Sequence, residues 1–362
     1  MLTAITFILI LFTAVMVHEG AHFLNAKSVG VPVRAFSIGL GPVLLRRRWR
    51  GTEWRVCLFL IGGYVDLPGM APRVDENGNL QHPDEGMAKK KIGAKLWVLA
   101  GGIIANFVLG VALLTTVVML QPGYRMYTSG ADVGRGSEVM SVMPGSPAAQ
   151  LGIVKGDRIA AINGVAEPTP EQVVKVIQQA SELTITLATA SGRRTVTTPW
   201  PPKNDIAKSD SGQPLLGVSV SPVFQGVALP QALAESAWFG ARVVPEIVRG
   251  FAQGFAAALT GHKNTEVAGP VGIVGMVNQA TQVGVVAVLW LAALINFSLA
   301  VFNLLPIPGL DGGRMLLAGV VALRGRPFKP GQEEYVHFIG FMAVLALIAL
   351  VTVHELSGLI HG

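Results

Sequence analysis

Residues 2–22 read LTAITFILILFTAVMVHEGAH. The run from Leu2 to Val17 carries no charge and leads directly into His18-Glu19-Gly20-Ala21-His22. On a helix, the His-Glu-x-x-His pattern places two imidazoles one turn apart on one face, where they can hold a zinc ion while the glutamate serves as general base. Ionisable groups inside a membrane segment are costly and mark function. The stretch therefore predicts a metalloprotease whose active site lies within a lipid bilayer.

The composition of the chain also indicates a membrane protein. Its 362 residues are 51% hydrophobic and only 14% charged, whereas soluble domains carry about 25% charged residues. The net charge is +6, but the basic residues border apolar spans as membrane topology requires, so nucleic-acid binding is excluded. The single cysteine, Cys57, allows no intrachain disulfide. The N-terminus lacks the basic region and cleavage site of a signal peptide, so the first span is expected to be permanent.

Four stretches are long and apolar enough to cross a bilayer, which takes about 20 residues. The loops between spans one and two and between spans three and four are rich in Lys and Arg, so both are expected in the cytoplasm. The two termini and residues 121–282 then lie on the extracytoplasmic side, and the His-Glu-x-x-His motif opens toward the cytoplasm. The spans run from about Leu2 to Leu24, Leu96 to Leu120, Val283 to Leu305 and Val336 to Val353.

The region 33–68 is apolar but interrupted by glycines and by a basic turn. Residues 36–42 and 56–65 have the composition of two strands, and neither is long enough to span the bilayer alone. A β-hairpin that enters the edge of the bilayer fits this pattern, provided that protein covers its backbone groups. An ordinary cytoplasmic hairpin is the alternative.

Residues 126–200 are predicted to form a compact α+β domain between spans two and three. The order of strands, turns and two helices, together with the run from Gly152 to Gly164 (GIVKGDRIAAING), resembles a bacterial PDZ domain. Such domains take an extended peptide onto a sheet edge beside a helix. A final strand is expected at 215–220. Amphipathic helices are expected at about 227–259, interrupted near Pro245, and they lie either on the membrane surface or against the PDZ domain.

A candidate third metal ligand follows span three. There the chain reads Asn303-Leu-Leu-Pro306-Ile-Pro308-Gly309-Leu-Asp311-Gly-Gly. The prolines stop the helix and the glycines allow a sharp turn. Catalytic zinc usually takes three protein ligands and keeps one position for water. Asp311 is the only carboxylate near the membrane part of span three, so we expect it to complete the site; a capping or turn role is the alternative.

Three asparagines lie in the apolar spans. Asn296 and Asn303 share one helix face, and Asn106 is the only strongly polar side chain inside span two. Such amides can bond neighbouring helices, or they can hold an extended substrate or a developing oxyanion. We favour a substrate role for Asn303, leave both open for Asn106 and favour helix contacts for Asn296. The pair His354-Glu355 lacks zinc-ligand spacing and is expected at a membrane interface.

Taken in order, these motifs resemble the site-2 proteases, which are zinc intramembrane metalloproteases. The resemblance is strongest to the bacterial branch with an extracytoplasmic PDZ domain, and it covers nearly the whole chain. Two departures are visible: some members of that branch carry two PDZ domains rather than one, and their Ala-Gly-Pro before the span-two asparagine is Ala-Gly-Gly here. The matching pieces are His18-Glu19-x-x-His22, Gly62-Gly63-Tyr64-Val65, Ala100 to Phe107, Gly269 to Ile273 and Asn303 to Gly313.

The resemblance implies a site and a set of contacts. His18, His22 and Asp311 would bind Zn²⁺ and Glu19 would be the general base. Asn303 would contact substrate, and the hairpin would be a membrane-reentrant β element. We also expect substrate contacts at Asn106 and at a strand edge formed by Gly62, Gly63 and Tyr64, because a transmembrane helix must unwind before cleavage and needs replacement backbone partners.

The resemblance also implies substrates, location and partners. The substrates would be single-pass transmembrane proteins, such as anti-sigma factors or remnant signal peptides, cut by regulated intramembrane proteolysis in the bacterial cytoplasmic membrane. The PDZ domain would gate access or bind an extracytoplasmic peptide or protein. A catalytically idle scaffold that presents the PDZ domain is the main alternative, and the intact motif argues against it. A transporter with broken helices is a further alternative that no inverted repeat supports.

The expected fold class is an α-helical polytopic membrane protein with four transmembrane helices, a membrane-reentrant β-hairpin and one inserted PDZ domain. The expected segments are 1–32 (first span and zinc motif), 33–68 (hairpin), 69–95 (basic cytoplasmic loop), 96–120 (second span), 126–200 (PDZ domain), 201–282 (linker and amphipathic helices), 283–305 (third span), 306–335 (Asp-bearing turn and cytoplasmic loop) and 336–362 (fourth span).

Overall fold

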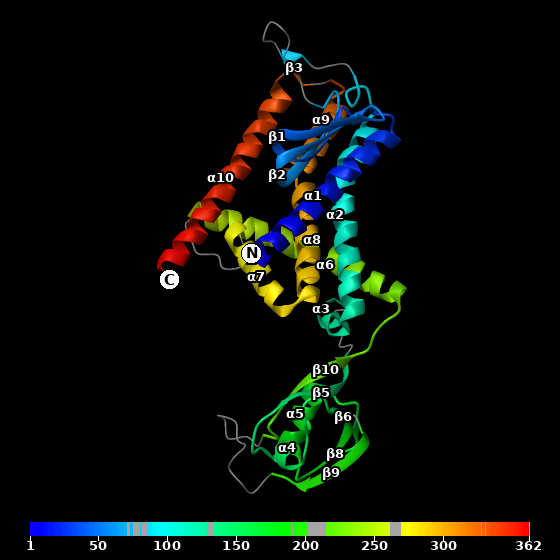
Figure 1. Ribbon diagram of the computed structural model, residues 1–362, viewed down its shortest axis with the longest axis vertical. Coiled ribbons are helices and arrows are strands. Elements are labelled where there is room, and N and C mark those ends of the chain that lie inside the picture. The colour runs from blue at the N-terminus through cyan, green and yellow to red at the C-terminus, as the bar shows by residue number, and fades with distance from the viewer. Residues whose placement is uncertain are drawn as a thin grey trace. The chain divides into compact units, whose positions relative to one another are not determined.

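The computed structural model separates the chain into two compact units, which Figure 1 shows in one view. The helical unit comprises Met1–Val117 and Ser236–Gly362, and the β-rich unit comprises Val118–Glu235. Each unit is described by itself. The structure describes residues 1–70, 73–74, 80–81, 85–128, 134–189, 191–201, 215–260, 269–326, 328–329 and 331–361.

Within these described ranges, four helices are long and apolar enough to cross a membrane. They are α1 (Leu2–Ser28), α2 (Ile92–Leu120), α8 (Val285–Leu304) and α10 (Gln332–His361). Only 11% of the apolar window of α1 and 6% of that of α10 are buried in the protein, so these helices leave broad apolar surfaces for lipid to cover. These four candidate spans are consistent with the predicted polytopic membrane protein.

The third span is preceded by a separate helix, α7 (Pro270–Val283). Gly284, with φ of 132°, separates α7 from α8, because this backbone conformation is open to glycine and disfavoured for other residues. The chain begins α7 with Pro270 at its first turn, a position where the missing N–H costs nothing. The helix α9 (Asp311–Arg324) follows α8 and ends at Gly325 in the left-handed conformation.

The helix α6 (Leu229–Thr260) runs through Pro245, where the sequence predicts an interruption. Contacts on both sides of the proline offset its missing hydrogen bond: Phe239 packs on Phe297 of α8 with ring centroids 6.3 Å apart, and Phe251 packs on Phe302 at 4.9 Å. The apolar face of α6 therefore packs against α8. Close approach requires glycine, because a Cβ at Gly240 would meet the Phe297 ring at 2.7 Å.

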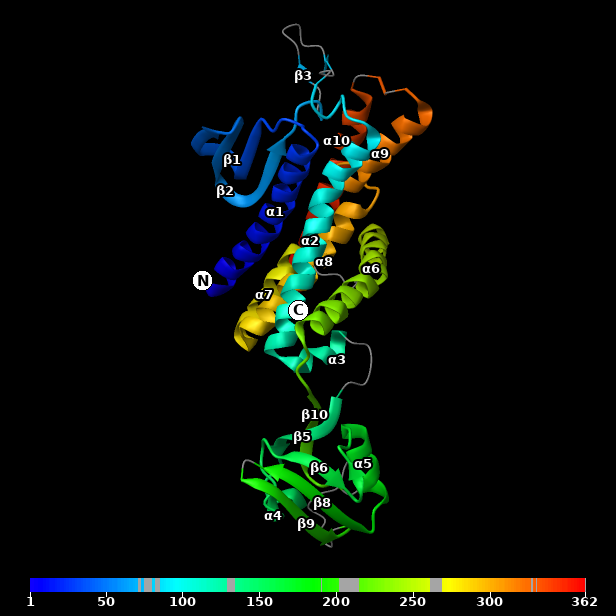
Figure 2. The ribbon, with the colours of Figure 1, turned by 90° about the vertical axis from the view of Figure 1, so that its right-hand side faces the viewer.

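The hairpin of β1 (Ala35–Trp49) and β2 (Thr52–Asp66) is folded over on itself. Residues 35–38 pair with 53–56 on one side and with 63–66 on the other, while 45–49 pair with 52–56. The order across this small sheet is therefore 45–49, 52–56, 35–38 and 63–66. The sheet lies beside the C-terminal half of α1 (Figure 2). A shorter pair, β3 (Arg73–Val74) and β4 (Leu80–Gln81), follows it.

Glu355 of α10 binds the start of α7. Its carboxylate accepts hydrogen bonds from the backbone N–H groups of Gly269 at 2.7 Å, Val271 at 3.1 Å and Gly272 at 3.1 Å. The first N–H groups of a helix have no partner within the helix, and a negative charge there is favourable. The sequence predicts Glu355 at a membrane interface, and the structure pairs its carboxylate with these three N–H groups.

The β-rich unit contains a sheet of order β10-β5-β6-β8-β9, in which β7 also pairs with β6. Its core includes Ile159, Leu183, Ile185 and Leu187, all fully buried, and Thr169 with Gln172 forms a capping box at the start of α5. The bounds are η1 Pro122–Tyr124, α3 Arg125–Thr128, β5 Gly134–Val142, α4 Pro147–Gln150, β6 Arg158–Ile162, β7 Val165–Ala166, α5 Pro170–Gln179, β8 Glu182–Thr189, β9 Gly192–Pro199 and β10 Val218–Phe224.

A buried ion pair joins the two ends of the β-rich unit. Arg125 donates to both carboxylate oxygens of Glu235, at 3.0 and 2.7 Å, and to the Gln225 carbonyl at 3.0 Å. The guanidinium holds the pKa of Glu235 below its ordinary value. Since a depressed carboxyl pKa stabilises the fold above the unfolded-state pKa, this contribution is lost as the pH falls through the folded-state value.

Candidate metal centre

Three ligand-type atoms from two distant parts of the chain converge in the helical unit. His18 and His22 lie one turn apart on α1, and Asp311 is the first residue of α9. Asp311 Oδ2 lies 3.1 Å from His18 Nε2 and 3.2 Å from His22 Nε2, and the two Nε2 atoms are 3.1 Å apart. The structure thus brings together the three residues that the sequence singled out as metal ligands.

We call His18 Nε2, His22 Nε2 and Asp311 Oδ2 the triangle. The hydrogen bonding of His22 shows which charge the triangle requires at its centre. Its Nδ1 lies 2.8 Å from the Val98 carbonyl oxygen, which can only accept, so Nδ1 carries the proton and the neutral ring presents a lone pair at Nε2. That lone pair faces Asp311 Oδ2, a buried oxygen with no hydrogen-bond donor among the described residues. Two acceptors at 3.2 Å repel each other unless a cation lies between them.

The size of the triangle fits zinc. Zinc binds imidazole nitrogen and carboxylate oxygen at about 2.0–2.1 Å in tetrahedral geometry, which separates neighbouring ligand atoms by about 3.3 Å. The observed edges are 3.1, 3.1 and 3.2 Å. A backbone carbonyl bound to the other ring nitrogen is the usual support for a metal-ligating histidine, and Val98 supplies it for His22.

Asn106 lies beside the other imidazole. Its side chain is 1% exposed, with Nδ2 3.5 Å from His18 Nδ1 and Oδ1 without a partner in the described structure. The two amide atoms differ only by assignment. Exchanging them lets Oδ1 accept a hydrogen bond from a proton on His18 Nδ1, which leaves His18 Nε2 with a lone pair directed toward the triangle.

Two glycines of α2 allow α1 to approach closely enough for these contacts. A Cβ at Gly102 would overlap the His18 ring, and one at Gly101 would meet Asn25 Nδ2 at 2.7 Å. Small residues permit close helix packing inside membranes. Glycine at 102 is therefore a packing requirement of the His18 ring, and glycine at 101 is a packing requirement of Asn25, roles that the sequence motif by itself does not reveal.

The turn before α9 presents Asp311, and α10 holds that turn. The backbone N–H of Gly309 donates to His337 Nδ1 of α10 at 2.8 Å, and Gly309 has φ of 99°. Cβ atoms at Gly312 and Gly313 would overlap backbone atoms of residues 304–308, so the turn can be this tight only with glycine there. Sequence reasoning missed His337, because its partner is a backbone group whose position depends on the tertiary fold.

Glu19 faces the β sheet. Its carboxylate lies close enough to the Val65 backbone to interact with it, and a Cβ added at Gly63 would lie 3.6 Å from Glu19 Cγ and 2.5 Å from Met16 Cε. The segment 63–66 pairs with 35–38 on one side and with no strand among the described residues on the other. Gly62 and Gly63 therefore let an unpaired strand edge run close beside the glutamate.

Three further side chains that the sequence singled out, those of Asn303, Asn296 and Tyr64, bond elsewhere. The amides of Asn303 and Asn296 donate to carbonyls of their own helix, Leu299 at 3.0 Å and Ala292 at 2.8 Å. Asn303 is half-buried, whereas Asn296 is 2% exposed. The Tyr64 hydroxyl accepts a hydrogen bond from Arg55 at 2.8 Å. No described contact joins these three side chains to the triangle.

A His-Glu-x-x-His helix and a distant aspartate that meet among apolar helices define the class of intramembrane metalloproteases. The chain belongs to peptidase family M50, the site-2 proteases, whose family model matches residues 6–347. It is similar to the putative zinc metalloprotease Atu1380 of Agrobacterium fabrum, with 32% identity over 98% of this chain and 96% of that protein.

Two further relatives extend this comparison. The chain is 26% identical to the probable protease Eep of Enterococcus faecalis and 24% identical to the regulator of sigma-W protease RasP of Bacillus subtilis, each over 99% of both chains. The protein is therefore a zinc metalloprotease of the site-2 protease family, and the predicted family, enzyme class and metal are confirmed.

We expect the zinc content of the purified chain to depend on the triangle. Wild-type protein should contain about one zinc ion per chain, and His22→Ala and Asp311→Ala should lose most of it, because two ligands hold zinc far more weakly than three. Metal analysis of detergent-purified protein measures this. Asp66→Ala, which removes a carboxylate elsewhere in the same unit, is the matched control. Full zinc occupancy in Asp311→Ala would contradict the assignment.

Proposed function

We propose that His18, His22 and Asp311 hold the zinc ion of this protease and that Glu19 is its general base. The observation that supports this is the convergence of Nε2, Nε2 and Oδ2 within 3.2 Å, with no proton available between His22 and Asp311 in the neutral ring. Zinc supplies a Lewis acid that lowers the pKa of a bound water and stabilises negative charge.

The residues around the zinc site carry the proton transfers. The Glu19 carboxylate takes the proton of the attacking water and delivers it to the nitrogen of the leaving amine. The nearby Val65 backbone is proposed to orient it. Asn106 orients His18 through Nδ1, which makes it a positioning residue in addition to the substrate contact expected from the sequence. Asn303, half-buried at the end of α8, is proposed to hold substrate backbone or oxyanion.

Glu19→Gln should abolish cleavage without removing the metal. Loss of a general base costs about 10²–10⁴-fold in rate, whereas the glutamine leaves both imidazoles in place. Cleavage of a transmembrane substrate in reconstituted vesicles, measured together with zinc content, tests both halves of the statement. Retention of more than a tenth of the activity would remove Glu19 from the mechanism.

The proposed substrates are single-pass transmembrane proteins of the anti-sigma-factor or signal-peptide type. Of the relatives, RasP of Bacillus subtilis is described as a regulator of sigma-W protease. A substrate helix shields its peptide bonds within its own hydrogen bonds and must unwind before attack. The unpaired edge at Gly62, Gly63 and Tyr64 supports strand addition of the unwound segment next to Glu19.

Substrates should be cut faster where their helices are weak. Replacing Gly or Pro near the scissile bond by Leu should slow cleavage about fivefold or more, because Gly costs about 1 kcal/mol and Pro about 3 kcal/mol in a helix interior. The rate is measured with purified enzyme and matched substrates. The same replacement at the distal end of the substrate helix is the control, and equal rates for all three substrates would rule out unwinding as the limiting requirement.

The apolar helices and the RasP-like relatives indicate a bacterial membrane protein. We propose that it is a multi-pass protein of the cytoplasmic membrane with its basic loops in the cytoplasm, as the distribution of Lys and Arg supports. The termini and the β-rich unit are then extracytoplasmic, the active site opens toward the cytoplasm, and the β1–β2 hairpin is reentrant.

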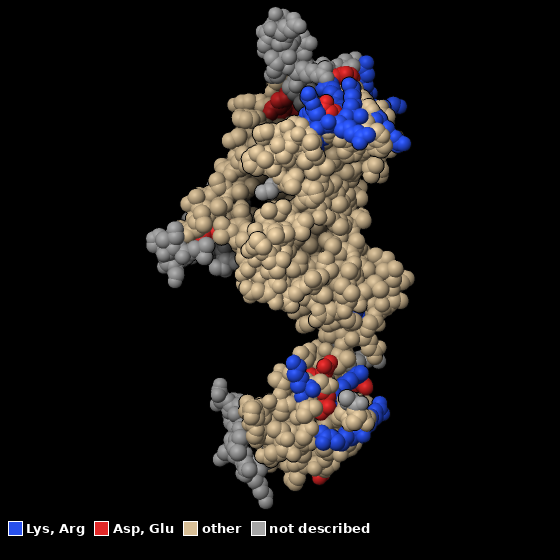
Figure 3. Space-filling view, viewed as in Figure 1, with Lys and Arg blue, Asp and Glu red and all other residues tan. Residues whose placement is uncertain are grey.

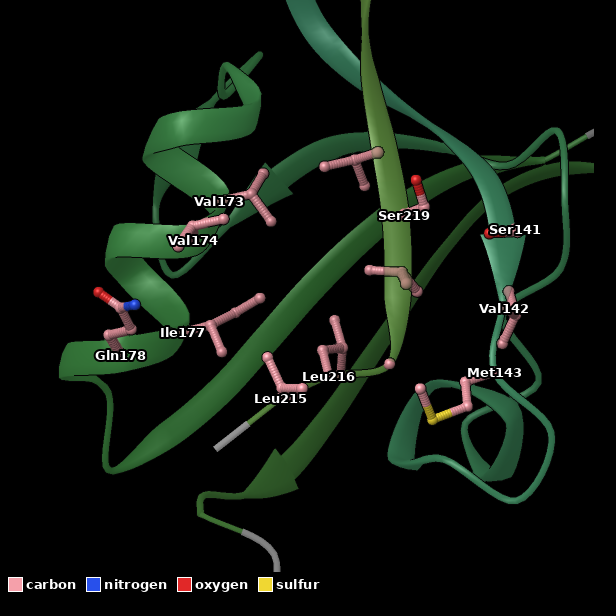
Figure 4. Close-up of a pocket in the computed structure, with 13 residues that line it drawn as sticks. Ser141, Val142, Met143, Val173, Val174, Ile177, Gln178, Leu215, Leu216 and Ser219 are labelled. Atoms are coloured by element: carbon pink, nitrogen blue, oxygen red, sulfur yellow. The ribbon is translucent and has the colours of Figure 1, made fainter. Parts of the chain in front are cut away.

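The β-rich unit is proposed to be a PDZ domain that binds an extended peptide. A groove of about 470 Å³ lies between α5 and β10. Figure 4 shows Val173 and Ile177 of α5 pointing toward β10, with Leu215 and Leu216 below them. The edge of β10 away from β5 pairs with no strand in the described part of the unit. An open strand edge beside an apolar helix face supports strand addition of a peptide with apolar side chains.

Val174→Asp should weaken peptide binding at this groove. Val174 lines the groove and is 49% exposed, so the aspartate leaves the fold intact but removes about tenfold or more of the affinity for a labelled peptide with an apolar C-terminus. Fluorescence anisotropy with the full chain measures this. Val154→Asp, at a residue that is 58% exposed and outside the groove, is the matched control. Equal affinities for both variants would exclude the groove.

A further inference from the structure

The β1–β2 hairpin changes polarity along its length. Residues 40–51 form a continuous exposed segment, LGPVLLRRRWRG. Its first half is apolar, with Leu44 58% and Leu45 69% exposed, and its second half carries four arginines and Trp49, which is 53% exposed. The opposing strand adds exposed Leu58, Phe59 and Leu60 to the apolar half. We call Arg46, Arg47, Arg48, Trp49 and Arg50 the basic tip.

This pattern differs from that of an ordinary half-buried strand. Successive side chains of a strand point to opposite faces, so a strand with one wet face alternates between apolar and polar residues. Here Val43, Leu44 and Leu45 are apolar on both faces, and Arg46 to Arg48 are basic on both faces. Both faces of the strand therefore change from apolar to basic at the same position, between Leu45 and Arg46. Residues 40–45 span at most about 16 Å at ~3.3 Å per residue, close to the ~15 Å hydrocarbon half of a bilayer.

The basic tip is a compact positive site. The two-residue turn Arg50-Gly51 closes it, and Trp49 pairs with Thr52. The Arg50 guanidinium lies over the Trp49 ring, 4.7 Å from its centroid. The nearest acid on the opposing strand, Glu53, forms its ion pair with Arg55 at 2.6 Å. Figure 3 shows that Lys and Arg gather at one end of the helical unit, while its flank on this face is nearly free of charge.

We propose that the basic tip is a binding site for anionic phospholipid headgroups of the leaflet that surrounds the helical unit. The guanidinium groups bind headgroup phosphates, for which their geometry is suited, and Trp49 lies at the interface between headgroups and acyl chains. The exposed apolar half of the hairpin lies in the hydrocarbon below. The partner is an anionic lipid surface because the charge of the tip is uniformly positive.

The basic tip is connected through the sheet to the unpaired strand edge beside Glu19. Residues 45–49 of the basic tip pair with 52–56, these pair with 35–38, and 35–38 pair with 63–66 beside Glu19. Three ladders of backbone hydrogen bonds thus link the headgroup site to the unpaired edge. Headgroup binding therefore helps to hold that edge at a constant depth in the bilayer, together with the ring contacts of Trp54 with Trp49 and with Phe23 of α1.

The test uses the full chain carrying Glu19→Gln, reconstituted in phosphatidylcholine vesicles. The fluorescence of Trp49, obtained by difference from Trp49→Phe, is titrated with brominated phosphatidylglycerol or with brominated phosphatidylcholine. One basic residue near the surface favours anionic lipid by about fivefold, so half-maximal quenching should need at least about tenfold less of the anionic lipid. High salt should reduce this preference, because screening weakens exposed charges.

Two sets of variants serve as controls. Changing Arg46, Arg47, Arg48 and Arg50 together to Gln should abolish the preference, while changing them together to Lys should keep most of it. Lys90→Gln with Lys91→Gln alters charge elsewhere in the helical unit and should leave it unchanged. In the wild-type tip, equal quenching by both lipids or no quenching by either would overturn the proposal. Reversal by inorganic phosphate at constant ionic strength would assign the site to free phosphate and overturn it as well.

Discussion

Two imidazole nitrogens and a carboxylate oxygen that converge within 3.2 Å of one another form the contact around which the helical unit is arranged. Such a group of acceptors is unfavourable in an apolar surrounding unless a cation joins it. Each surrounding feature supports it: the Val98 carbonyl fixes the His22 tautomer, and Gly102 admits the His18 ring. The fold therefore supplies three converging acceptor atoms, an arrangement that a bound cation would stabilise.

The same rule applies to the other polar groups inside the apolar spans. Hydrocarbon offers no hydrogen bonds, so each group needs a partner in the protein. Thr115, Thr116 and Asn303 donate to carbonyls one turn earlier in their own helices. Thr3 and Asn25 of α1 bond other helices, and Asn106 of α2 lies beside His18 Nδ1. Asn106 thus marks the face of α2 that packs against the imidazole of His18.

Much of this arrangement was predictable from the sequence, because composition and short-range spacing determine it. Uncharged runs of sufficient length predict the spans, and the spacing of His18 and His22 requires that they share a helix face. The position of Asp311 beside them, the folded-over pairing of β1 with β2 and the role of His337 depend on contacts between distant segments. Pro245 shows the opposite case, since packing on α8 overrides a local signal for interruption.

The three hydrogen bonds that Glu355 accepts have a consequence for motion. If α10 moved away from the start of α7, one carboxylate would lose three hydrogen bonds and three N–H groups would lose their shared acceptor, which is costly wherever water does not replace them. The contact therefore favours joint movement of the two helices. The turn before Asp311 is tied to the same α10 through His337, so Gly284 is the described break in helical backbone between this group and α8.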